Sequence, residues 1–201
     1  MAKVERIAVL GGSFDPVHIG HLLVAQDACE AMELDRVLLT PAAQAPLKSR
    51  SPGASGAQRV EMLRRAAALV PWLEVWDFEV LKGDLSFSYL TAEALRERFP
   101  QARLFWILGA DQLAQLHKWK NTDRLLAEVE VICVRRPDSG GEIAQPIPPG
   151  IPADRLHFIT SRLVEMSSTE VQNRLRAGVD VQFFLPAPVV DFIRSEHLYL
   201  K

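Results

Sequence analysis

The sequence predicts an α/β domain of the Rossmann-like, doubly wound type, with a mainly parallel sheet covered by helices on both faces. Short apolar runs rich in β-branched residues alternate with longer segments of helical period. The 201 residues suit one hydrophobic core, so residues 1–201 are predicted to form a single domain. Hydrophobic residues make up 48% and charged residues 24%, which argues against disordered, collagen-like and coiled-coil proteins.

Six short apolar segments are predicted as strands. In chain order they are Arg6–Leu10, Arg36–Thr40, Leu73–Phe78, Arg103–Leu108, Glu130–Val134 and Leu156–Thr160. Helices are predicted at Ile19–Met32, Gln58–Leu69, Tyr89–Phe99, Asp123–Ala127, Ser168–Arg176 and Pro188–Glu196. This alternation is typical of βαβ units.

The first helix carries a mostly apolar stripe, with Asp27 and Glu30 predicted on the other side. Two stretches rich in proline, glycine and small residues, Pro41–Gly56 and Pro137–Pro152, are predicted as mobile loops. The first follows the C-terminal end of a strand, where parallel sheets bind ligands.

Charge and cysteine content exclude several classes of protein. Lys and Arg number 23 against 25 Asp and Glu, a net charge of −2, so no nucleic acid partner is expected. No apolar run approaches the roughly 20 residues that span a bilayer, so no membrane association is expected. Cys29 and Cys133 lie in apolar stretches, which suggests buried thiols in a reducing cytoplasm. The oligomeric state stays open, a homo-oligomer being one alternative.

The most informative stretch is Gly11–His21, GGSFDPVHIGH, which follows an apolar strand and opens a helix. Its backbone N–H groups and the helix N-terminus predict an anion site, with phosphate as the natural ligand. Because His18 and His21 are three residues apart, they should project from one face of the helix. Gly20, between them, is expected to leave room for a phosphate or nucleotide.

Three other known motifs are excluded by the identity and spacing of the residues in this stretch. The glycines do not match a dinucleotide fingerprint, the Gly-Lys-Ser/Thr of a P-loop is absent, and Asp15 stands where a nucleophile elbow around Ser13 needs glycine. Two alternatives remain for His18 and His21, metal ligation and a solvent-facing loop with incidental histidines. No further Cys or His lies nearby in sequence to complete a metal site.

The stretch Gly11–His21 resembles the GGxFDPxHxGH signature of the HxGH nucleotidyltransferases, and within them the bacterial nicotinate-nucleotide adenylyltransferases. Further segments agree with that family. They are Ser55–Leu63, Gly109–Leu113 followed by His117–Trp119, Ser167–Thr169 at a helix start, and the tail from Phe184–Pro186 to His197–Tyr199. The resemblance runs from the first strand to the C-terminus and implies the nucleotidyltransferase fold.

The resemblance implies transfer of the AMP part of ATP to nicotinate mononucleotide, giving deamido-NAD and pyrophosphate in NAD biosynthesis. The catalytic residues are then His18 and His21, with Mg²⁺ bridging the triphosphate. No metal-binding residues are expected. ATP-binding residues are Gly11, Gly12, Ser13, Phe14, His18, Gly20, His21, Arg136, Ser167, Ser168 and Thr169. From the sequence alone, Ser167–Thr169 fit a simple helix cap equally well, and Arg136 a solvated strand end.

For the acceptor, the resemblance implies that Trp119 stacks on the pyridine ring, with Asp111 near the ribose or phosphate. The full set is Lys48, Tyr89, Thr91, Gly109, Asp111 and Trp119. The simpler alternatives are a core role for Trp119, although its charged neighbours argue against full burial, and a solvated loop lysine for Lys48.

Three positions depart from the family pattern. Leu47 replaces a histidine before Lys48, Gln172 replaces an arginine that contacts the ATP phosphates, and Thr91 matches the threonine near the nicotinate carboxylate only with a register shift. These departures leave two alternatives open. One is the same reaction on another phosphorylated acceptor, such as nicotinamide mononucleotide or phosphopantetheine, and the other is a catalytically silent nucleotide-binding regulatory module.

Overall fold

The computed structural model describes residues 3–44, 52–135, 150–162 and 164–200. Six parallel strands form one open sheet in the order β3-β2-β1-β4-β5-β6. The strands are β1 Arg6–Gly12, β2 Arg36–Pro41, β3 Leu73–Val75, β4 Arg103–Gly109, β5 Glu130–Arg135 and β6 Leu156–Thr160. This order is that of a doubly wound Rossmann-like sheet, as the sequence predicts.

The α-helices are α1 Ile19–Ala31, α2 Gly56–Ala67, α3 Phe78–Lys82, α4 Ser88–Arg98, α5 Ala110–Ala114, α6 Thr122–Glu128, α7 Ser168–Arg176 and α8 Ala187–Ser195. Two 3₁₀ turns, η1 Leu116–Lys118 and η2 Ala153–Arg155, complete the helical segments of the described residues. Within the described part of the chain, none of the helices has the length and apolar character needed to cross a membrane.

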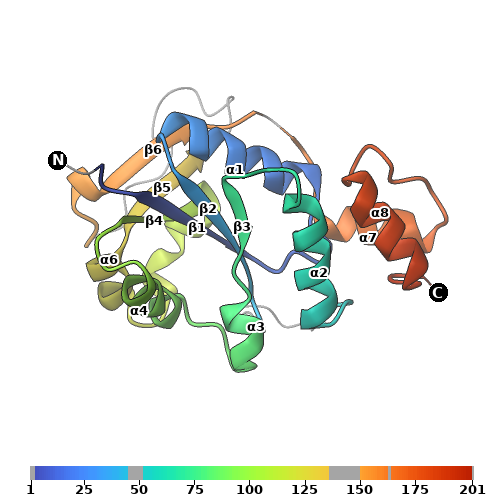
Figure 1. Cartoon of the computed structure of the whole chain (residues 1–201), viewed down its shortest axis with the longest axis horizontal. Helices are drawn as coiled ribbons and strands as arrows, with labels where there is room; N and C mark the ends of the chain where they lie inside the picture. Colours follow the sequence, from blue (N-terminus) through green and yellow to red (C-terminus); the bar gives the residue numbers. More distant parts are fainter. Residues whose placement is uncertain (1–2, 45–51, 136–149, 163, 201) are drawn as a thin grey trace.

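The strands are buried on both faces, and their side chains alternate between two cores. On β1, Ala8 and Leu10 face a core that includes residues of α1, α2 and α8, whereas Ile7 and Val9 face a core that includes residues of α4, α5 and α6. In Figure 1, α1 and α4 lie on opposite faces of the sheet. The near-continuous apolar runs in the sequence are therefore explained by two-sided burial.

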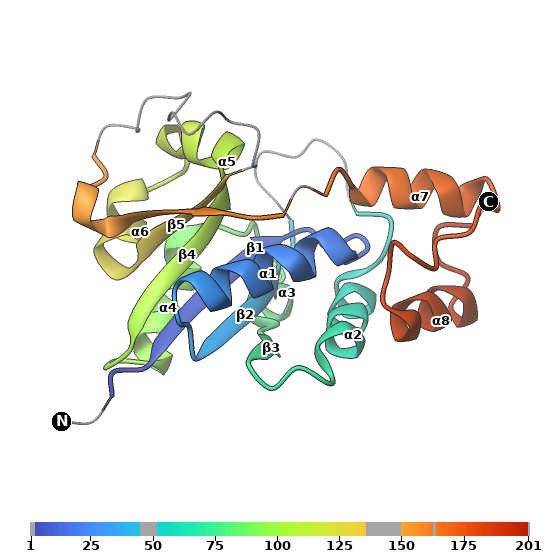
Figure 2. The same ribbon diagram turned by 90° about the horizontal axis from the view of Figure 1, so that it is seen from above.

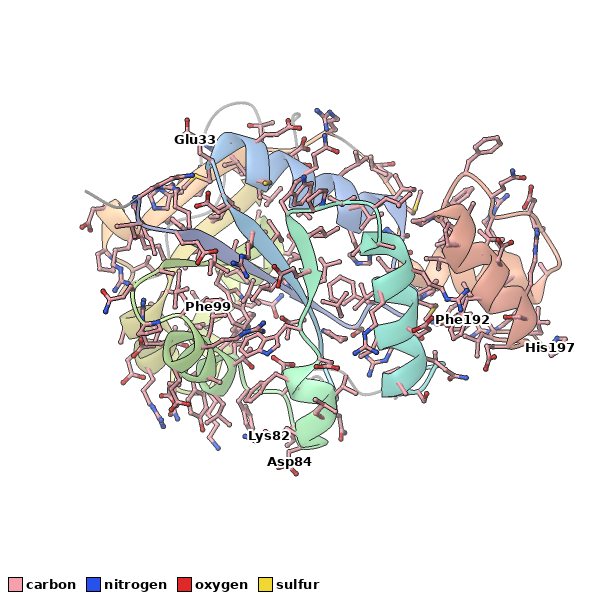
Figure 3. All side chains as sticks on the ribbon, viewed as in Figure 1. Glu33, Lys82, Asp84, Phe99, Phe192 and His197 are labelled. Carbon is pink, nitrogen blue, oxygen red and sulfur yellow. The ribbon has the colours of Figure 1, made fainter. Side chains whose placement is uncertain are left out.

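The last helices, α7 and α8, lie together at one end of the molecule, beyond α2 (Figure 2). Phe192 on α8 lies at the boundary with α2 (Figure 3), where the Arg65 guanidinium is 4.7 Å from the centroid of its ring. Residues of α8 belong to the same core as β1 and α1, so this end of the chain is packed onto the domain. We call residues 164–200 the C-terminal unit.

The strand order reverses between β1 and β4, because the sheet continues from β1 through β2 on one side and through β4 on the other. Open α/β sheets bind ligands at such a switch point, beyond the carboxyl ends of the strands. Gly12, at the end of β1, leads directly into this position, and Gly109 ends the neighbouring β4. The fold therefore places the predicted motif at the position where open α/β sheets bind ligands.

For the predicted strand Leu73–Phe78, the predicted C-terminal end is wrong, because β3 ends at Val75. Pairing ends at Val75, the Trp76 amide makes one further bond to the Leu39 carbonyl at 3.0 Å, and α3 begins at Phe78. Gly83, with φ of 74°, terminates α3 in the left-handed conformation that glycine adopts readily. Helices as short as α3 and α5 carry too few turns to show a helical period, so the sequence did not predict them.

The prediction for Asp27 is also wrong, since this carboxylate is buried. It accepts hydrogen bonds from the Ser161 hydroxyl at 2.6 Å and the Arg162 amide at 3.0 Å, and it pairs with the Arg162 guanidinium at 2.7 Å. These contacts compensate for the burial of the Asp27 carboxylate and attach the segment after β6 to α1.

The two cysteines differ in burial. Cys29 is half-buried and not buried as predicted, whereas Cys133 is buried as predicted.

Candidate active site

The turn after β1 is shaped by Phe14. This residue has a φ of 46°, and its ring is buried in the core. A Cβ atom at Gly12 would lie 3.0 Å from the Phe14 ring, so glycine is needed there for close packing. Because the ring faces the core, Phe14 can offer a nucleotide only its backbone.

The two histidines of the motif lie against each other. His18 is the N-cap of α1, and its ring stacks on that of His21 with centroids 3.7 Å apart. The His18 amide donates to Nδ1 of His21 at 3.2 Å. An acceptor Nδ1 places the ring proton of His21 on Nε2, the nitrogen farther from the backbone. The prediction that the two side chains share one face of the helix is confirmed.

His18 is buried, with 5% of its surface exposed. Burial lowers the pKa of its imidazole from 6.5 to about 4, so the ring is neutral near pH 7. Within the described residues, its Nδ1 atom has no hydrogen-bond partner. A buried ring with an unsatisfied nitrogen is costly to maintain, and such groups are often functional.

Gly20 has a different role from the one expected. A Cβ atom there would lie 3.1 Å from Nδ1 of His18 and 3.2 Å from its Cε1. The space beside Gly20 is therefore filled by the His18 ring and not left open for a phosphate.

We expect Gly20→Ala to shift the His18 ring and thereby lower kcat. The loss of stability that is typical of core substitutions is not expected, because alanine is favoured over glycine in helices. Steady-state rates and thermal unfolding of the variant test this, and a wild-type kcat would contradict it.

The N-terminus of α1 is less available to an anion than the sequence suggests. The Ile19 amide donates to the Phe184 carbonyl at 2.9 Å, and the His18 amide is bonded to His21. Two N–H groups expected to face a phosphate are thus already engaged. These two amides are therefore not available to an anion in this conformation.

Ser167–Thr169 lie beside the motif, as the resemblance implies. Ser167 caps α7 by accepting a hydrogen bond from the Glu170 amide at 3.1 Å, so the helix-cap interpretation is correct for its hydroxyl. The Ser168 hydroxyl donates to the Pro16 carbonyl at 2.9 Å, whereas the Thr169 side chain is exposed. The start of α7 is therefore attached to the β1 turn, 152 residues away in sequence.

Asp15, to which the sequence interpretation gave no role, is a centre of hydrogen bonding. Its buried carboxylate accepts from the amides of Gly53 and Ala54, from the Gln172 side chain and from the Tyr199 hydroxyl. The Asp15 backbone carbonyl accepts a further bond from Gln172 at 2.6 Å. The motif residue between Phe14 and Pro16 thus connects the turn to three other segments.

Arg59 on α2 is also buried, with 1% of its surface exposed. Its guanidinium donates to the carbonyls of Ser13 at 2.8 Å and Ala43 at 3.4 Å. Burial lowers the pKa of this guanidinium, while the charge of Asp15 opposes that effect. Arg59 belongs to Ser55–Leu63, one of the segments that agree with the family. Its hydrogen bond to the Ser13 carbonyl shows that it supports the turn after β1.

The predicted acceptor residues fall into two groups. Gly109 caps α5, with its amide donating to the Gln112 side chain at 3.1 Å, and Asp111 is exposed in the first turn of that helix. Trp119 follows η1 and is half-buried against the second core. The Thr122 hydroxyl donates to the Trp119 carbonyl at 3.0 Å, which fixes the backbone at the tryptophan.

Tyr89 and Thr91 form the second group, and both are buried on α4. The Thr91 hydroxyl donates to Glu79 at 2.6 Å, beside a small open pocket with a cavity volume of only about 10 Å³. The pocket is lined by Phe78, Glu79, Lys82, Asp84, Leu85, Ser86, Phe87, Leu90 and Thr91. In Figure 3, Lys82 and Asp84 lie at the end of α3, at the rim of this region.

Glu79 was missed by the sequence interpretation. Burial raises the pKa of its carboxyl, and hydrogen bonds from Thr91 and Ser86 oppose that rise. Ser86 in turn accepts from the Ala43 amide at 2.9 Å, just after β2. Lys120 connects the tryptophan segment to the pocket, because its ammonium lies 4.5 Å from the centroid of the Phe87 ring. Lys120, next to Trp119 in sequence, is therefore in contact with Phe87, which lines the pocket.

Several predicted residues lie elsewhere. Lys48, Leu47 and Arg136 lie outside the described residues. Arg174 is two residues after Gln172, donates to the Asp180 carbonyl at 2.9 Å and lies over the Phe184 ring. Because it is engaged there, Arg174 does not take the place of the arginine that the family pattern has at position 172.

Comparison with known proteins shows the family of this chain. The family model described as "Cytidylyltransferase-like" matches residues 9–174. A probable nicotinate-nucleotide adenylyltransferase of Opitutus terrae is 42% identical, with 96% of this chain and 97% of that protein covered. One of Gemmatimonas aurantiaca is 41% identical, with 96% and 92% covered. This chain belongs to the nicotinate-nucleotide adenylyltransferase family.

Solved structures show the same fold at lower identity. The nicotinic acid mononucleotide adenylyltransferase of Plasmodium falciparum complexed with APC has a TM-score of 0.68 at 16% identity, with 97% of both chains covered. A putative nicotinate-nucleotide adenylyltransferase from Vibrio parahaemolyticus has a TM-score of 0.64 at 18% identity, with 98% of this chain and 96% of that chain covered. These two solved structures thus share the fold of this chain.

Proposed function

We propose that this protein transfers the adenylyl group of ATP to nicotinate mononucleotide, giving deamido-NAD and pyrophosphate. The observation that carries the proposal is the stacked pair His18 and His21 at the switch point of the sheet, on a turn attached to Ser168. The relatives that match almost the full length of this chain carry the corresponding name.

The reaction needs no general base and no covalent intermediate on the protein. The acceptor phosphate is already ionised at pH 7, so one of its oxygens attacks the α-phosphorus of ATP directly. A bond forms between that oxygen and the α-phosphorus, and the bond from the α-phosphorus to the oxygen bridging it to the β-phosphorus breaks. Pyrophosphate leaves with the electron pair of the broken bond.

His18 and His21 are proposed as the catalytic residues. A neutral His18 and a His21 with its proton on Nε2 are hydrogen-bond donors on one face of α1, suited to the phosphate oxygens on which charge develops. Backbone groups of Gly11, Gly12 and Ser13 and the hydroxyls of Ser167, Ser168 and Thr169 are proposed to line the rest of the triphosphate site. Arg136 is proposed beside the adenine.

Mg²⁺ is proposed to bind with ATP. In the described parts of the chain, no three Asp, Glu, His or Cys side chains form a group that could hold a metal ion. The residues present therefore fit an ion held mainly by phosphate oxygens and water, which is the usual mode of Mg²⁺ with nucleotides. When bound, the ion supplies charge neutralisation on the triphosphate.

The acceptor is proposed to bind between Trp119 and the pocket beside α4, with Lys48, Tyr89, Thr91, Gly109 and Asp111 around it. The ring of nicotinate mononucleotide is a cationic pyridinium, which is attracted to an indole face. We expect Trp119→Ala to raise the KM for the acceptor about 5- to 30-fold, as for a loss of about 1–2 kcal/mol, with little change in the KM for ATP.

Trp119→Phe is the matched variant, because it keeps an aromatic face and should raise the acceptor KM much less. An unchanged acceptor KM in Trp119→Ala would leave this residue with a packing role only.

Isotope labelling tests the reaction type. Nicotinate mononucleotide with ¹⁸O in its phosphate should give labelled deamido-NAD and unlabelled pyrophosphate, as followed by mass spectrometry. Release of AMP together with an acceptor that carries the pyrophosphoryl group would show attack at the β-phosphorus and refute the proposed step, as would label in the pyrophosphate.

A further inference from the structure

The Asp15 carboxylate receives four hydrogen bonds from segments far apart in sequence. The amides of Gly53 and Ala54 donate at 2.7 and 3.0 Å, the Gln172 side-chain amide at 2.9 Å and the Tyr199 hydroxyl at 2.7 Å. Only 7% of the Asp15 surface is exposed. A buried carboxylate with this many donors is held in one position, because each bond lost leaves a costly unsatisfied group.

Tyr199 comes from the end of the chain. Its backbone is in the left-handed region, with φ of 61°, and its ring packs on the backbone of Gly53, where a Cβ atom would lie 3.2 Å from the ring. Burial, the hydrogen bond to Asp15 and the charge of Asp15 raise the pKa of the Tyr199 hydroxyl above its ordinary range. The hydroxyl therefore stays protonated near pH 7 and can donate to Asp15.

Other contacts join the C-terminal unit to the same turn. The Phe184 carbonyl accepts from the Ile19 amide at 2.9 Å, and the Ser168 hydroxyl donates to the Pro16 carbonyl at 2.9 Å. The chain between Asp15 and Ile19, which includes His18, is thus attached to the C-terminal unit at each end. Arg59 on α2 donates to the Ser13 carbonyl, two residues before Asp15, and so attaches the start of the turn to α2.

Gln172 is one of the three departures from the family pattern, and its contacts show which groups its side chain binds. Its amide nitrogen donates both to the Asp15 carbonyl at 2.6 Å and to the Asp15 carboxylate at 2.9 Å. Its amide oxygen accepts from Arg176 at 2.9 Å. Both ends of the side chain are therefore engaged within the protein.

We propose that the C-terminal unit positions the catalytic histidines through Asp15, with Tyr199 and Gln172 as the positioning residues. The inference rests on the proposed function. Asp15 is three residues before His18, so a shift of its carboxylate moves the turn that carries the stacked rings. Small displacements of catalytic groups lower rates strongly even when the altered residue is remote from the reacting atoms.

Tyr199→Phe tests this by removing one hydroxyl and keeping the ring. We expect kcat to fall about tenfold or more, with little change in the KM for the acceptor. Amide hydrogen exchange should become faster at Ile19, Gly53 and Ala54 in the absence of substrate. Ser195→Ala is the matched control, because it removes a hydroxyl of α8 that donates to the Phe192 carbonyl and does not contact Asp15.

The two variants separate positioning from stability. If Tyr199 has only a structural role, both variants lose stability and both keep the wild-type kcat per folded molecule, measured well below their unfolding temperatures. That result, with unchanged exchange at the three amides, would overturn the proposal. Wild-type protein that turns over no acceptor would refute the proposed function instead, whereas the exchange experiment would still test the positioning.

A second variant covers failure of Tyr199→Phe to fold. Gln172→Met keeps the length of the side chain and removes the donor to Asp15. It should lower kcat and speed exchange at Ile19, and a wild-type kcat and exchange rate in this variant would also overturn the proposal.

Discussion

We expect His21→Ala to lower kcat for pyrophosphate release by about 10²–10³-fold, because the imidazole that it removes is the proposed donor to phosphate oxygens on which charge develops in the transition state. The substitution leaves the core intact, so the unfolding temperature should change little. Steady-state rates with saturating Mg-ATP and nicotinate mononucleotide, together with thermal unfolding, measure both effects.

His157→Gln is the control for His21→Ala. His157 is on β6, near its N-terminal end, where its Nε2 atom is 2.6 Å from the Glu130 carboxylate. That end of a parallel sheet is opposite the ligand-binding edge, and glutamine can keep a hydrogen bond to Glu130. A His21→Ala variant that is as active as His157→Gln would remove His21 from the catalytic role.

Acidification should destabilise the protein through His18. Its pKa is about 4 in the folded state against 6.5 ordinarily, so the unfolded chain binds more protons between these values. The free energy of unfolding therefore falls as the pH drops through this window, by about 3 kcal/mol in total from this residue. The contribution is fully present above about pH 6.5 and is lost by about pH 4.

Urea unfolding of the wild type and of His18→Gln at a series of pH values measures this effect. The variant lacks the titrating ring, so the stability of the wild type should fall more steeply than that of the variant as the pH is lowered. Parallel pH profiles for the two proteins would contradict the assignment of a buried, neutral His18.

Most of the fold could be predicted from local sequence patterns. The strands were predicted because their residues form apolar runs of their own, and the central strands β1, β2, β4 and β5 are buried along most of their length. The end of β3 was misjudged because apolar residues lie on both sides of Asp77, the N-cap of α3, and α3 is too short to show a helical period. Asp27 was assigned to the exposed side because its partners, Ser161 and Arg162, are more than 130 residues away.

The same distinction applies to the site. His18 and His21 are close in sequence and on one helix, so their spacing predicts their contact. The role of Asp15 depends on donors 38 to 184 residues away, which no local pattern reveals. Glu79 was missed for the same reason, since its burial follows from the packing of α3 against α4.

Pyrophosphate release with different acceptors tests the central claim most directly. The acceptors are nicotinate mononucleotide, nicotinamide mononucleotide and phosphopantetheine, each with Mg-ATP and compared with a reaction lacking acceptor. We predict a kcat/KM for nicotinate mononucleotide far above that for the others, which would also show that Leu47 and Gln172 are compatible with activity. A higher kcat/KM for another acceptor would contradict the proposed substrate, and no release with any acceptor, in protein that still binds ATP, would contradict the proposed reaction.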